Sequence, residues 1–331
     1  MTAPWIRTQL RQLLTQRGHA WLLQGPSGLG QYKLALGLAQ AWLCDRPTPE
    51  GACGECGSCH QVEVRSHTDL AVLMPETEML AREWPLAEKA QSDIDEKKRK
   101  PSREIRVEAM RDAIEFAQRT SGRGRGKVVL VYPADRMNAV TANALLKTLE
   151  EPPGDVRFVL ATEAAHLLLP TIRSRCLGHP MAWPAAGEAT AWLQEEGVAA
   201  AAAPVLLRAA GGRPEDALRL HQGGLDARAW SQWPKALVRG DSAAIGEGGP
   251  ADLVEALQKL CHDLLAVRCG AAPRFFEAAD LPPPASVEAL TRWWRSLAAT
   301  SRTVDHPFNA GLLLEDLVSQ ARSALHSRGQ P

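Results

Sequence analysis

A glycine-rich loop near the N-terminus has the spacing of a phosphate-binding loop but lacks its reactive side chains. The loop reads Gly25-Pro26-Ser27-Gly28-Leu29-Gly30-Gln31-Tyr32. In a working loop, G-x-x-x-x-G-K-[ST], the lysine contacts the β- and γ-phosphates and the hydroxyl residue binds Mg²⁺. Here Gln31 and Tyr32 occupy those two positions. The sequence therefore keeps the glycines Gly25, Gly28 and Gly30 and loses the groups that handle ATP.

The acidic half of such a nucleotide site is missing as well. A working site places two acids after a core strand, where they bind Mg²⁺ and polarise water, but here Tyr132 and Pro133 follow the strand. Asp135 lies too far along the chain to replace the pair in register. Lys33 stands two places after the expected lysine, and a helix turns about 200° over two residues, so this side chain should point elsewhere. We therefore expect no ATP hydrolysis in cis, although backbone N–H groups of residues 28–31 could still bind an anion weakly.

Four of the seven cysteines cluster within sixteen residues, at Cys44, Cys53, Cys56 and Cys59. Four thiolates at about 2.3 Å around a tetrahedral ion form the closed, structural type of zinc site. Glycines between the cysteines allow the tight turns that such a knuckle needs. An iron–sulfur cluster is the main alternative, because four cysteines suit it too. The sequence predicts structural Zn²⁺, with no coordination position open for catalysis.

The elements that would position these groups alternate between residues 6 and 176. Apolar runs lie at 20–23, 70–74, 128–132 and 158–161, and helical patterns lie at 33–43, 105–120 and 138–150. Strands that alternate with helices predict an α/β fold with a parallel sheet covered on both faces. Residues 87–103 carry mixed charge with little to bury, which predicts a solvated loop or disordered insert rather than a nucleic-acid patch.

The strand signal fades after Pro180, and the rest of the chain reads as helical. Short helices are expected over 185–222, with a break before Pro214. Turn clusters are expected at 240–250 and 281–284. Apolar stripes at helical spacing predict core positions at Leu253, Leu257, Leu260, Leu264, Leu312, Leu313, Leu317 and Ala321. Trp293 and Trp294 are adjacent and cannot both face the core, so one of them should lie at an interface.

Composition limits the classes of function that remain. The chain has 331 residues, enough for two or three domains, and its 38 Lys+Arg residues balance 38 Asp+Glu residues. No global positive field draws in nucleic acid. No stretch of about 20 apolar residues is present, and residues 1–14 lack an apolar signal core. We expect a cytoplasmic protein without a membrane partner.

Two further motifs make the pattern specific. Residues 144–153 read ALLKTLEEPP, and Ser174-Arg175-Cys176 follows the apolar run that ends near Thr162. Together with the cysteine knuckle, these residues resemble the AAA+ clamp-loader family of bacterial DNA polymerase III, over residues 18–180. The resemblance implies three parts: a RecA-like AAA+ core over 1–180 with the knuckle at 44–59, a small helical lid over 181–222, and an all-α collar over 223–331.

The resemblance also implies a role in trans. In this family each ATP lies at a subunit boundary, and the arginine of the Ser-Arg-Cys motif reaches the γ-phosphate held by a neighbour. Arg175 would then be an arginine finger, a task that suits a planar, always charged fork of donors. Arg173 is the nearest alternative, and Thr162 occupies the position of a polar sensor. ATP would bind only at the neighbouring subunit.

The implied partners are the motor ATPase subunits and the clamp-opening subunit of a hetero-oligomeric ring. Through this ring the protein would act on the sliding clamp and primed DNA at the replisome on the nucleoid. An active motor subunit of the same family is one alternative, but a lysine near Gly30 would then be expected. A zinc-dependent nucleic-acid-binding module is another. Residues 50–60 argue against it, because they hold two acids and no Lys, Arg, Phe, Tyr or Trp.

Overall fold

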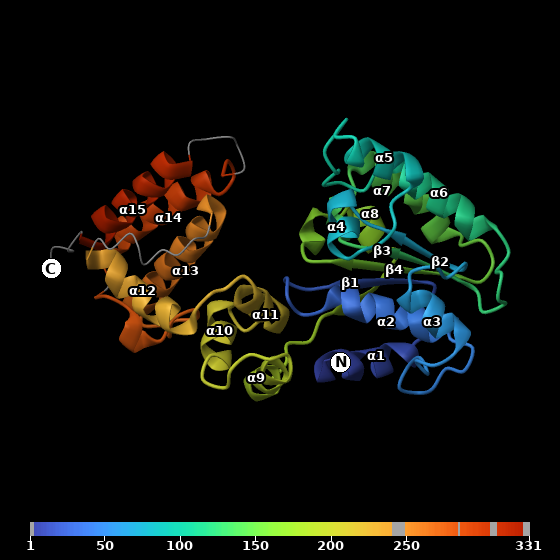
Figure 1. Ribbon diagram of the computed structural model, residues 1–331, viewed down its shortest axis with the longest axis horizontal. Helices are drawn as coiled ribbons and strands as arrows, with labels where there is room; N and C mark the ends of the chain where they lie inside the picture. Colours follow the sequence, from blue (N-terminus) through green and yellow to red (C-terminus); the bar gives the residue numbers. More distant parts are fainter. Residues whose placement is uncertain (1–2, 240–248, 284, 305–309, 327–331) are drawn as a thin grey trace. The chain divides into compact units, whose positions relative to one another are not determined.

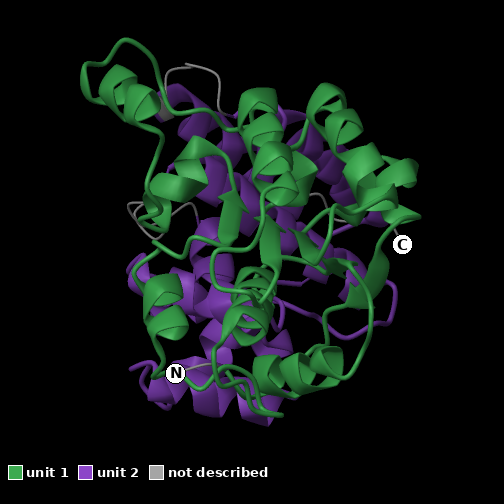
Figure 2. Ribbon diagram, turned by 90° about the vertical axis from the view of Figure 1, so that its right-hand side faces the viewer, with its two compact units in different colours: residues 1–184 green, residues 185–331 purple. Residues whose placement is uncertain are grey.

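The chain forms two compact units, Met1–Pro184 and Ala185–Pro331 (Figures 1 and 2). The computed structural model describes residues 3–239, 249–283, 285–304 and 310–326. The first unit is α/β, and the described part of the second unit is all-α. The predicted turn clusters at 240–250 and 281–284 lie largely or partly outside the described residues. Among the helices described, none is both long enough and apolar enough to cross a bilayer.

A five-stranded parallel sheet forms the centre of the first unit. Its strands are β1 (Ala20–Gln24), β2 (Leu70–Leu73), β3 (Lys127–Val131), β4 (Val156–Thr162) and β5 (Leu177–Pro180). Their order across the sheet is β2-β3-β4-β1-β5, and every neighbouring pair is parallel. Gln24 at the end of β1 pairs in register with Thr162 at the end of β4. The carboxyl ends of β1, β3 and β4 therefore meet at one edge, where open α/β sheets bind ligands.

Helices cover both faces of this sheet (Figure 1). On one side lie α1 (Pro4–Leu14) and α2 (Gln31–Leu43), and on the other lie α6 (Val107–Gln118) and α7 (Ala139–Glu150). Both faces of β3 are buried, which explains its continuous apolar sequence. The remaining elements of the unit are α3 (Gly57–Glu63), α4 (Glu76–Ala81), α5 (Glu88–Asp95), η1 (Ala134–Arg136), η2 (Ala165–Leu167) and α8 (Pro170–Arg173).

The predicted fold class is confirmed, and each of the four apolar runs forms a strand. The structure adds β5, which the sequence did not reveal. Most side chains of Leu177–Pro180 are exposed, and the strand is held at the sheet edge by its backbone pairing with β1. An edge strand of this kind needs no apolar pattern, so its sequence gives little signal.

The expectation of a solvated loop or disordered insert at residues 87–103 is wrong for residues 88–95, which form a helix, although this helix is solvated as expected. This segment contains α5, and it is attached to the core by an ion pair. The guanidinium of Arg99 donates to the buried Glu76 carboxylate at 2.5 and 2.8 Å, and the backbone N–H of Ser102 donates to the same group at 2.7 Å. Because α5 buries no side chain, polar contacts rather than apolar burial order this segment.

The second unit consists of helices in its described part. They are α9 (Ala186–Glu195), α10 (Ala203–Ala209), α11 (Pro214–Gln222), α12 (Ala227–Arg239), α13 (Pro250–Arg268), η4 (Ala278–Asp280), α14 (Val287–Thr300) and α15 (Ala310–His326). The leucine stripe of α13 is buried as predicted, and so are Leu317 and Ala321 of α15. Leu312 is 65% exposed, so its predicted core position is wrong. It is five residues before Leu317, or about 140° around the helix from the buried stripe.

Trp293 and Trp294 divide as expected, because the first is buried and the second is exposed. Trp230 stacks on Phe276 at 4.6 Å between ring centroids within the same core. The predicted division of the helical half at residue 222 stays a prediction.

Candidate functional site

The glycine-rich loop joins the end of β1 to the start of α2, as its sequence predicts. Gly28 and Gly30 have φ angles of 77° and 92°, in the left-handed region that glycine adopts without a steric penalty. The carbonyl of Gly30 accepts the first hydrogen bond of α2 from the N–H of Leu34 at 2.9 Å. The strand–loop–helix frame of a phosphate-binding site is therefore intact.

Gln31, which stands where a working loop has lysine, closes this loop on itself. Its side chain is 2% exposed. Its Nε2 donates to the carbonyls of Gly25 at 2.8 Å and Pro26 at 2.6 Å. A neutral amide that is engaged by two loop carbonyls offers no charge to a phosphate. The structure thus shows a loop whose first two carbonyls accept hydrogen bonds from Gln31 of the same chain.

Two residues from distant parts of the first unit also contact the loop. Trp5 of α1 donates from Nε1 to the carbonyl of Leu29 at 3.0 Å. Met181, fixed by a 2.8 Å bond from its N–H to the carbonyl of Gln24, lies against Gly25. A Cβ added at Gly25 would lie 2.9 Å from the Cβ of Met181. The loop is therefore in contact with α1 through Trp5 and with the residue after β5 through Met181.

In a working site, the hydroxyl residue of the loop and the acid after the core strand bind Mg²⁺. Here tyrosines stand at both positions, and the two side chains lie close together. The rings of Tyr32 and Tyr132 lie 5.4 Å apart between centroids. The guanidinium of Arg82 lies 4.5 Å from the centre of the first ring and 5.0 Å from that of the second, within the range of cation–π attraction. Arg82 also pairs with Glu78 at 3.2 Å. A fixed cation therefore lies beside the position where a working site holds its metal.

The hydroxyl groups of both tyrosines are engaged and remain protonated. Trp84 Nε1 donates to Tyr32 Oη at 2.7 Å, and Tyr132 Oη donates to Glu163 Oε1 at 3.1 Å. Burial raises the pKa of Tyr32 and raises the pKa of Tyr132 far above its usual value. Neutral phenols are poor ligands for Mg²⁺, which prefers carboxylate and phosphate oxygen.

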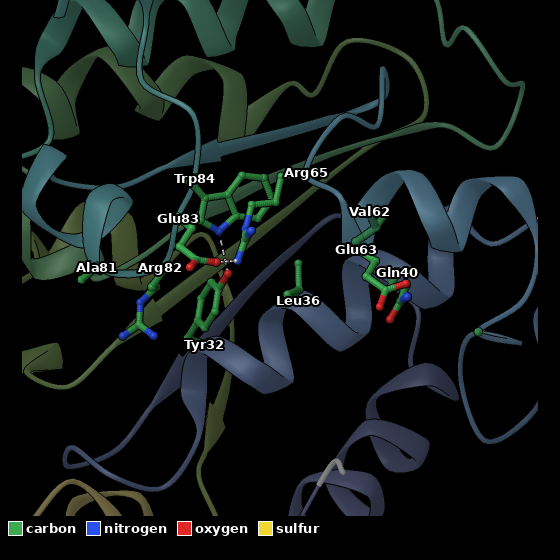
Figure 3. A pocket seen from close by; sticks show the side chains of 11 residues that line it. Tyr32, Leu36, Gln40, Val62, Glu63, Arg65, Ala81, Arg82, Glu83 and Trp84 are labelled. Atoms are coloured by element: carbon green, nitrogen blue, oxygen red, sulfur yellow. Dashed lines mark hydrogen bonds and ion pairs between the residues drawn. The ribbon is translucent and has the colours of Figure 1, made fainter. Parts of the chain in front are cut away.

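A groove of about 680 Å³ opens beside Tyr32 (Figure 3). Helix α2 also contributes Leu36 and Gln40, and the remaining lining comes from Gly54, from α3 and Arg65, and from residues 81–84 at the end of α4. Arg65 in this groove pairs with Glu83 at 3.4 Å. The two arginines of the lining, Arg65 and Arg82, thus each have a carboxylate partner. The lining is mixed rather than cationic, which does not favour a phosphate ligand.

Thr162, at the predicted sensor position, makes local hydrogen bonds. Its Oγ1 donates to Asp135 Oδ1 at 2.5 Å and accepts from the N–H of Ala164 at 3.1 Å. The side chain of Asp135 therefore lies at the carboxyl edge of the sheet, but it is paired with Thr162.

The four clustered cysteines converge as their spacing predicts. Their Sγ atoms all lie within 4.8 Å of one another. The separation is 3.4 Å between Cys56 and Cys59, 3.6 Å between Cys44 and Cys59, and 3.9 Å between Cys53 and Cys59. A tetrahedral ion with 2.3 Å metal–sulfur bonds requires sulfur–sulfur edges of roughly 3.8 Å. The four thiols therefore fit a metal ion, and no histidine belongs to the group found among the described residues.

Backbone donors surround these sulfur atoms. The N–H groups of Cys53 and Arg46 donate to Cys44 Sγ at 3.3 and 3.4 Å, and the N–H of Cys59 donates to Cys56 Sγ at 3.4 Å. A backbone hydrogen bond from Glu55 lowers the pKa of Cys53 to about 6. Burial raises the pKa of Cys59 instead. A bound cation would favour the thiolate form of all four cysteines.

An aspartate that the sequence did not single out attaches the knuckle to the core. Asp45 accepts from Ser58 Oγ at 2.8 Å and from Arg123 Nη2 at 3.1 Å. The hydrogen bond from Ser58 lowers the pKa of Asp45 to about 2. Arg123 lies in the loop between α6 and β3, so the pair joins the knuckle to the strand layer. Only the position of Asp45 next to Cys44 could have suggested this role.

The structure places Arg175 at the surface, two residues after the end of α8. Its Nε donates to Glu150 Oε1 at 2.7 Å, its Nη2 contacts the same carboxylate oxygen, and its Nη1 donates to the carbonyl of Thr171 at 2.8 Å. Glu150 is the last residue of α7. The sequence assigns no chemistry to this glutamate, and no local pattern links it to an arginine 25 positions later.

The sheet order and the glycine-rich loop at the end of β1 define an AAA+-type α/β protein in which Gln31 and Tyr32 stand where a working loop has its lysine and its hydroxyl residue. The sequence pattern of the family described as "DNA polymerase III, delta subunit" matches residues 6–182. The chain belongs to this family. The resemblance to DNA polymerase III subunits that the motifs indicated is thereby confirmed.

Individual relatives agree with this assignment. The chain is 39% identical to DNA polymerase III subunit delta' of Pseudomonas aeruginosa over 226 residues, which cover 67% of this chain and 62% of the relative. It is 34% identical to the protein of the same name from Escherichia coli K12, covering 66% of this chain and 61% of the relative. The alignments thus span about three-fifths of these relatives.

A solved structure shares the fold over nearly the whole chain. The crystal structure of a DNA polymerase III gamma subunit-related protein from Thermotoga maritima aligns with a TM-score of 0.50 and 17% identity. The alignment covers 97% of this chain and 99% of that chain. At this identity the likeness concerns the fold alone.

Proposed function

We propose that this protein is a clamp-loader subunit of a bacterial DNA polymerase III that hydrolyses no ATP itself. In this role it supplies Arg175 to an ATP molecule held by a neighbouring subunit. The observation that carries the first half of the proposal is the closed nucleotide site. Gln31 is engaged by the carbonyls of Gly25 and Pro26, and the half-buried Tyr32 and the buried Tyr132 occupy the positions of the Mg²⁺ ligands.

The second half rests on Arg175. Its guanidinium is at the surface of an AAA+-type unit, in a Ser-Arg-Cys motif, and 30% of its side chain is exposed. A partner could reach it without unfolding of the core. An arginine supplied in trans stabilises charge on a transferring phosphoryl group and is worth about 10³–10⁵ in rate. The delta' names of the relatives, which call them subunits of a polymerase, support a role within an assembly.

In this assembly the partners would be motor ATPase subunits and a clamp-opening subunit, arranged in a hetero-oligomeric ring. The ring would place a sliding clamp on primed DNA. Residues 1–180 would form the AAA+ core, residues 181–222 a lid and residues 223–331 a collar that packs against sister subunits. Zn²⁺ would occupy the four-cysteine site as a structural ion, because four thiolates leave no position for a reacting water.

An active motor subunit of the same family is the second candidate, and the site argues against it. Lys33, the nearest lysine after the loop, lies on the exposed side of α2. Mg²⁺ would have to displace the Tyr32–Tyr132 contact and the Arg82 guanidinium. We therefore favour the inactive subunit.

The test is Arg175→Ala in a clamp loader reconstituted with its sister subunits. Hydrolysis at the adjoining ATP site should fall about 10³-fold or more, and the rate of the whole complex should fall with it. Arg173→Ala tests the alternative finger, because Arg173 is an exposed arginine two residues away. If Arg175 is the finger, Arg173→Ala should cost far less activity than Arg175→Ala. Assembly should be unchanged for both variants. Wild-type turnover by an assembled Arg175→Ala complex would remove the assignment.

A further inference from the structure

The ion pair between Arg175 and Glu150 has a consequence for how the arginine reaches a phosphate. We propose that Glu150 is the positioning residue of Arg175. Its carboxylate holds the guanidinium against the end of α7 until a phosphate of the neighbouring subunit's nucleotide takes its place. This inference rests on the proposed function, because it needs Arg175 to act in trans.

The N–H donors of the Arg175 guanidinium are already engaged by acceptors of the same chain. Nε and Nη2 of Arg175 both contact Glu150 Oε1, and Nη1 donates to the carbonyl of Thr171. Carboxylates and phosphates accept from the same edge of a guanidinium. The carboxylate of Glu150 therefore takes the place that a phosphate oxygen would take, and the two acceptors compete for one set of donors.

The position of Glu150 explains why this contact can be exchanged. Glu150 ends α7, where the negative end of the helix dipole disfavours a carboxylate and favours a nearby cation. The side chains of Arg175 and Glu150 are 30% and 47% exposed, so water screens their attraction. An exposed pair of this kind is weak. A polyphosphate carries more charge than a single carboxylate and can displace it.

The exchange should appear in the dependence of hydrolysis on ATP concentration. The ion pair between Arg175 and Glu150 must break before Arg175 can contact ATP. The free energy needed to break it raises the ATP concentration at which hydrolysis is half-maximal. Glu150→Gln removes the charge and keeps the shape. In the reconstituted complex it should lower that concentration about 2- to 5-fold and leave the maximal rate unchanged.

Three variants make the test specific. Glu151→Gln, at the adjacent exposed carboxylate, should behave as wild type. Glu150→Asp keeps the carboxylate and should stay within about twofold of wild type. In the Arg175→Ala background, Glu150→Gln should have no further effect, because a positioning residue acts only through the arginine. If Glu150 had a purely structural role, Glu150→Gln would not lower the ATP concentration for half-maximal rate at an unchanged maximal rate only when Arg175 is present.

A second readout uses the chain alone and does not depend on the proposed function. In NMR spectra of the isolated protein, the Arg175 Nε–H should exchange with water more slowly in wild type than in Glu150→Gln. If this exchange is equally fast in wild type, the holding contact is refuted. If Glu150→Gln leaves half-saturation unchanged or raises it while Arg175→Ala abolishes turnover, the competition is refuted and the finger stands. If Arg175→Ala has no effect, the proposed function fails.

Discussion

Gln31→Met tests the closure of the phosphate-binding loop. Methionine has nearly the same length and volume as glutamine but cannot donate a hydrogen bond. The variant should therefore leave the carbonyls of Gly25 and Pro26 without their donor while the packing of α2 stays the same. Because both carbonyls lie at the start of the loop, the effect should be local to the first unit.

The size of the effect follows from the two hydrogen bonds that are lost, at 2.8 and 2.6 Å. Each such bond contributes about 0.5–1.5 kcal/mol net. Pro26 is exposed, so water can partly replace the bond to its carbonyl. We expect a loss of about 1–2 kcal/mol in the free energy of opening the first unit. Hydrogen exchange of the core amides of β1 and β4 should then accelerate about 5- to 30-fold.

Hydrogen exchange is the appropriate assay because it reports each unit separately in a chain with two units. Gln40→Met is the matched control: Gln40 lies on the same helix, and its amide makes no hydrogen bond in the described part of the chain. The amides of α13 in the second unit serve as an internal reference. Exchange in β1 and β4 that does not differ between Gln31→Met and wild type would refute the closure of the loop by Gln31.

Two further predictions concern the knuckle and the charged insert. Wild-type protein should contain about one zinc ion per chain. Cys59→Ser should lose the zinc and expose α3 to protease, since the ion contributes on the order of 10 kcal/mol to local folding. The control Cys269→Ser, at an exposed cysteine, should keep the zinc, and iron in place of zinc in the wild type would refute the assignment. The Arg99 guanidinium holds the pKa of Glu76 below its usual value, so the stability from this carboxylate is complete above about pH 4.5 and is lost as the pH falls below it. Cleavage of residues 96–102 by an acid protease, measured relative to cleavage of an unfolded peptide at the same pH, should therefore increase as the pH falls below about 4.5. In Glu76→Gln, a protease that is active at neutral pH should already cleave this segment at pH 7. A wild-type relative rate that does not change with pH would contradict the anchoring role of Glu76.

Regular patterns in the sequence predicted the parts of this protein that depend on burial. The strands β1, β3 and β4 read as apolar runs because both of their faces are covered. The convergence of the four cysteines was predictable because all four lie within one short segment, so their spacing alone constrains their geometry. The absence of the lysine and of the hydroxyl residue could also be seen in the sequence, because the glycines of the motif show that Gln31 and Tyr32 stand at those positions.

The parts that could not be predicted depend on contacts between distant residues. Arg82 packs on Tyr132 from 50 positions earlier in the sequence, and Glu150 holds Arg175 across 25 positions. No local pattern marks either pair. Helix α5 buries no side chain, and β5 is an exposed edge strand, so neither has the periodicity on which prediction relies. In each case a polar or backbone contact decides the structure.

The central claim is that this chain does not bind and hydrolyse ATP at its own glycine-rich loop, and that it acts instead on ATP held by a neighbouring subunit. The most direct measurement is a titration of the isolated protein with Mg·ATP, followed by NMR at the amides of Gly28 and Gly30. We expect no saturable shift up to about 1 mM, the upper end of ordinary substrate affinities, and no turnover. Saturable shifts at both glycines, accompanied by hydrolysis that survives further purification, would contradict the account.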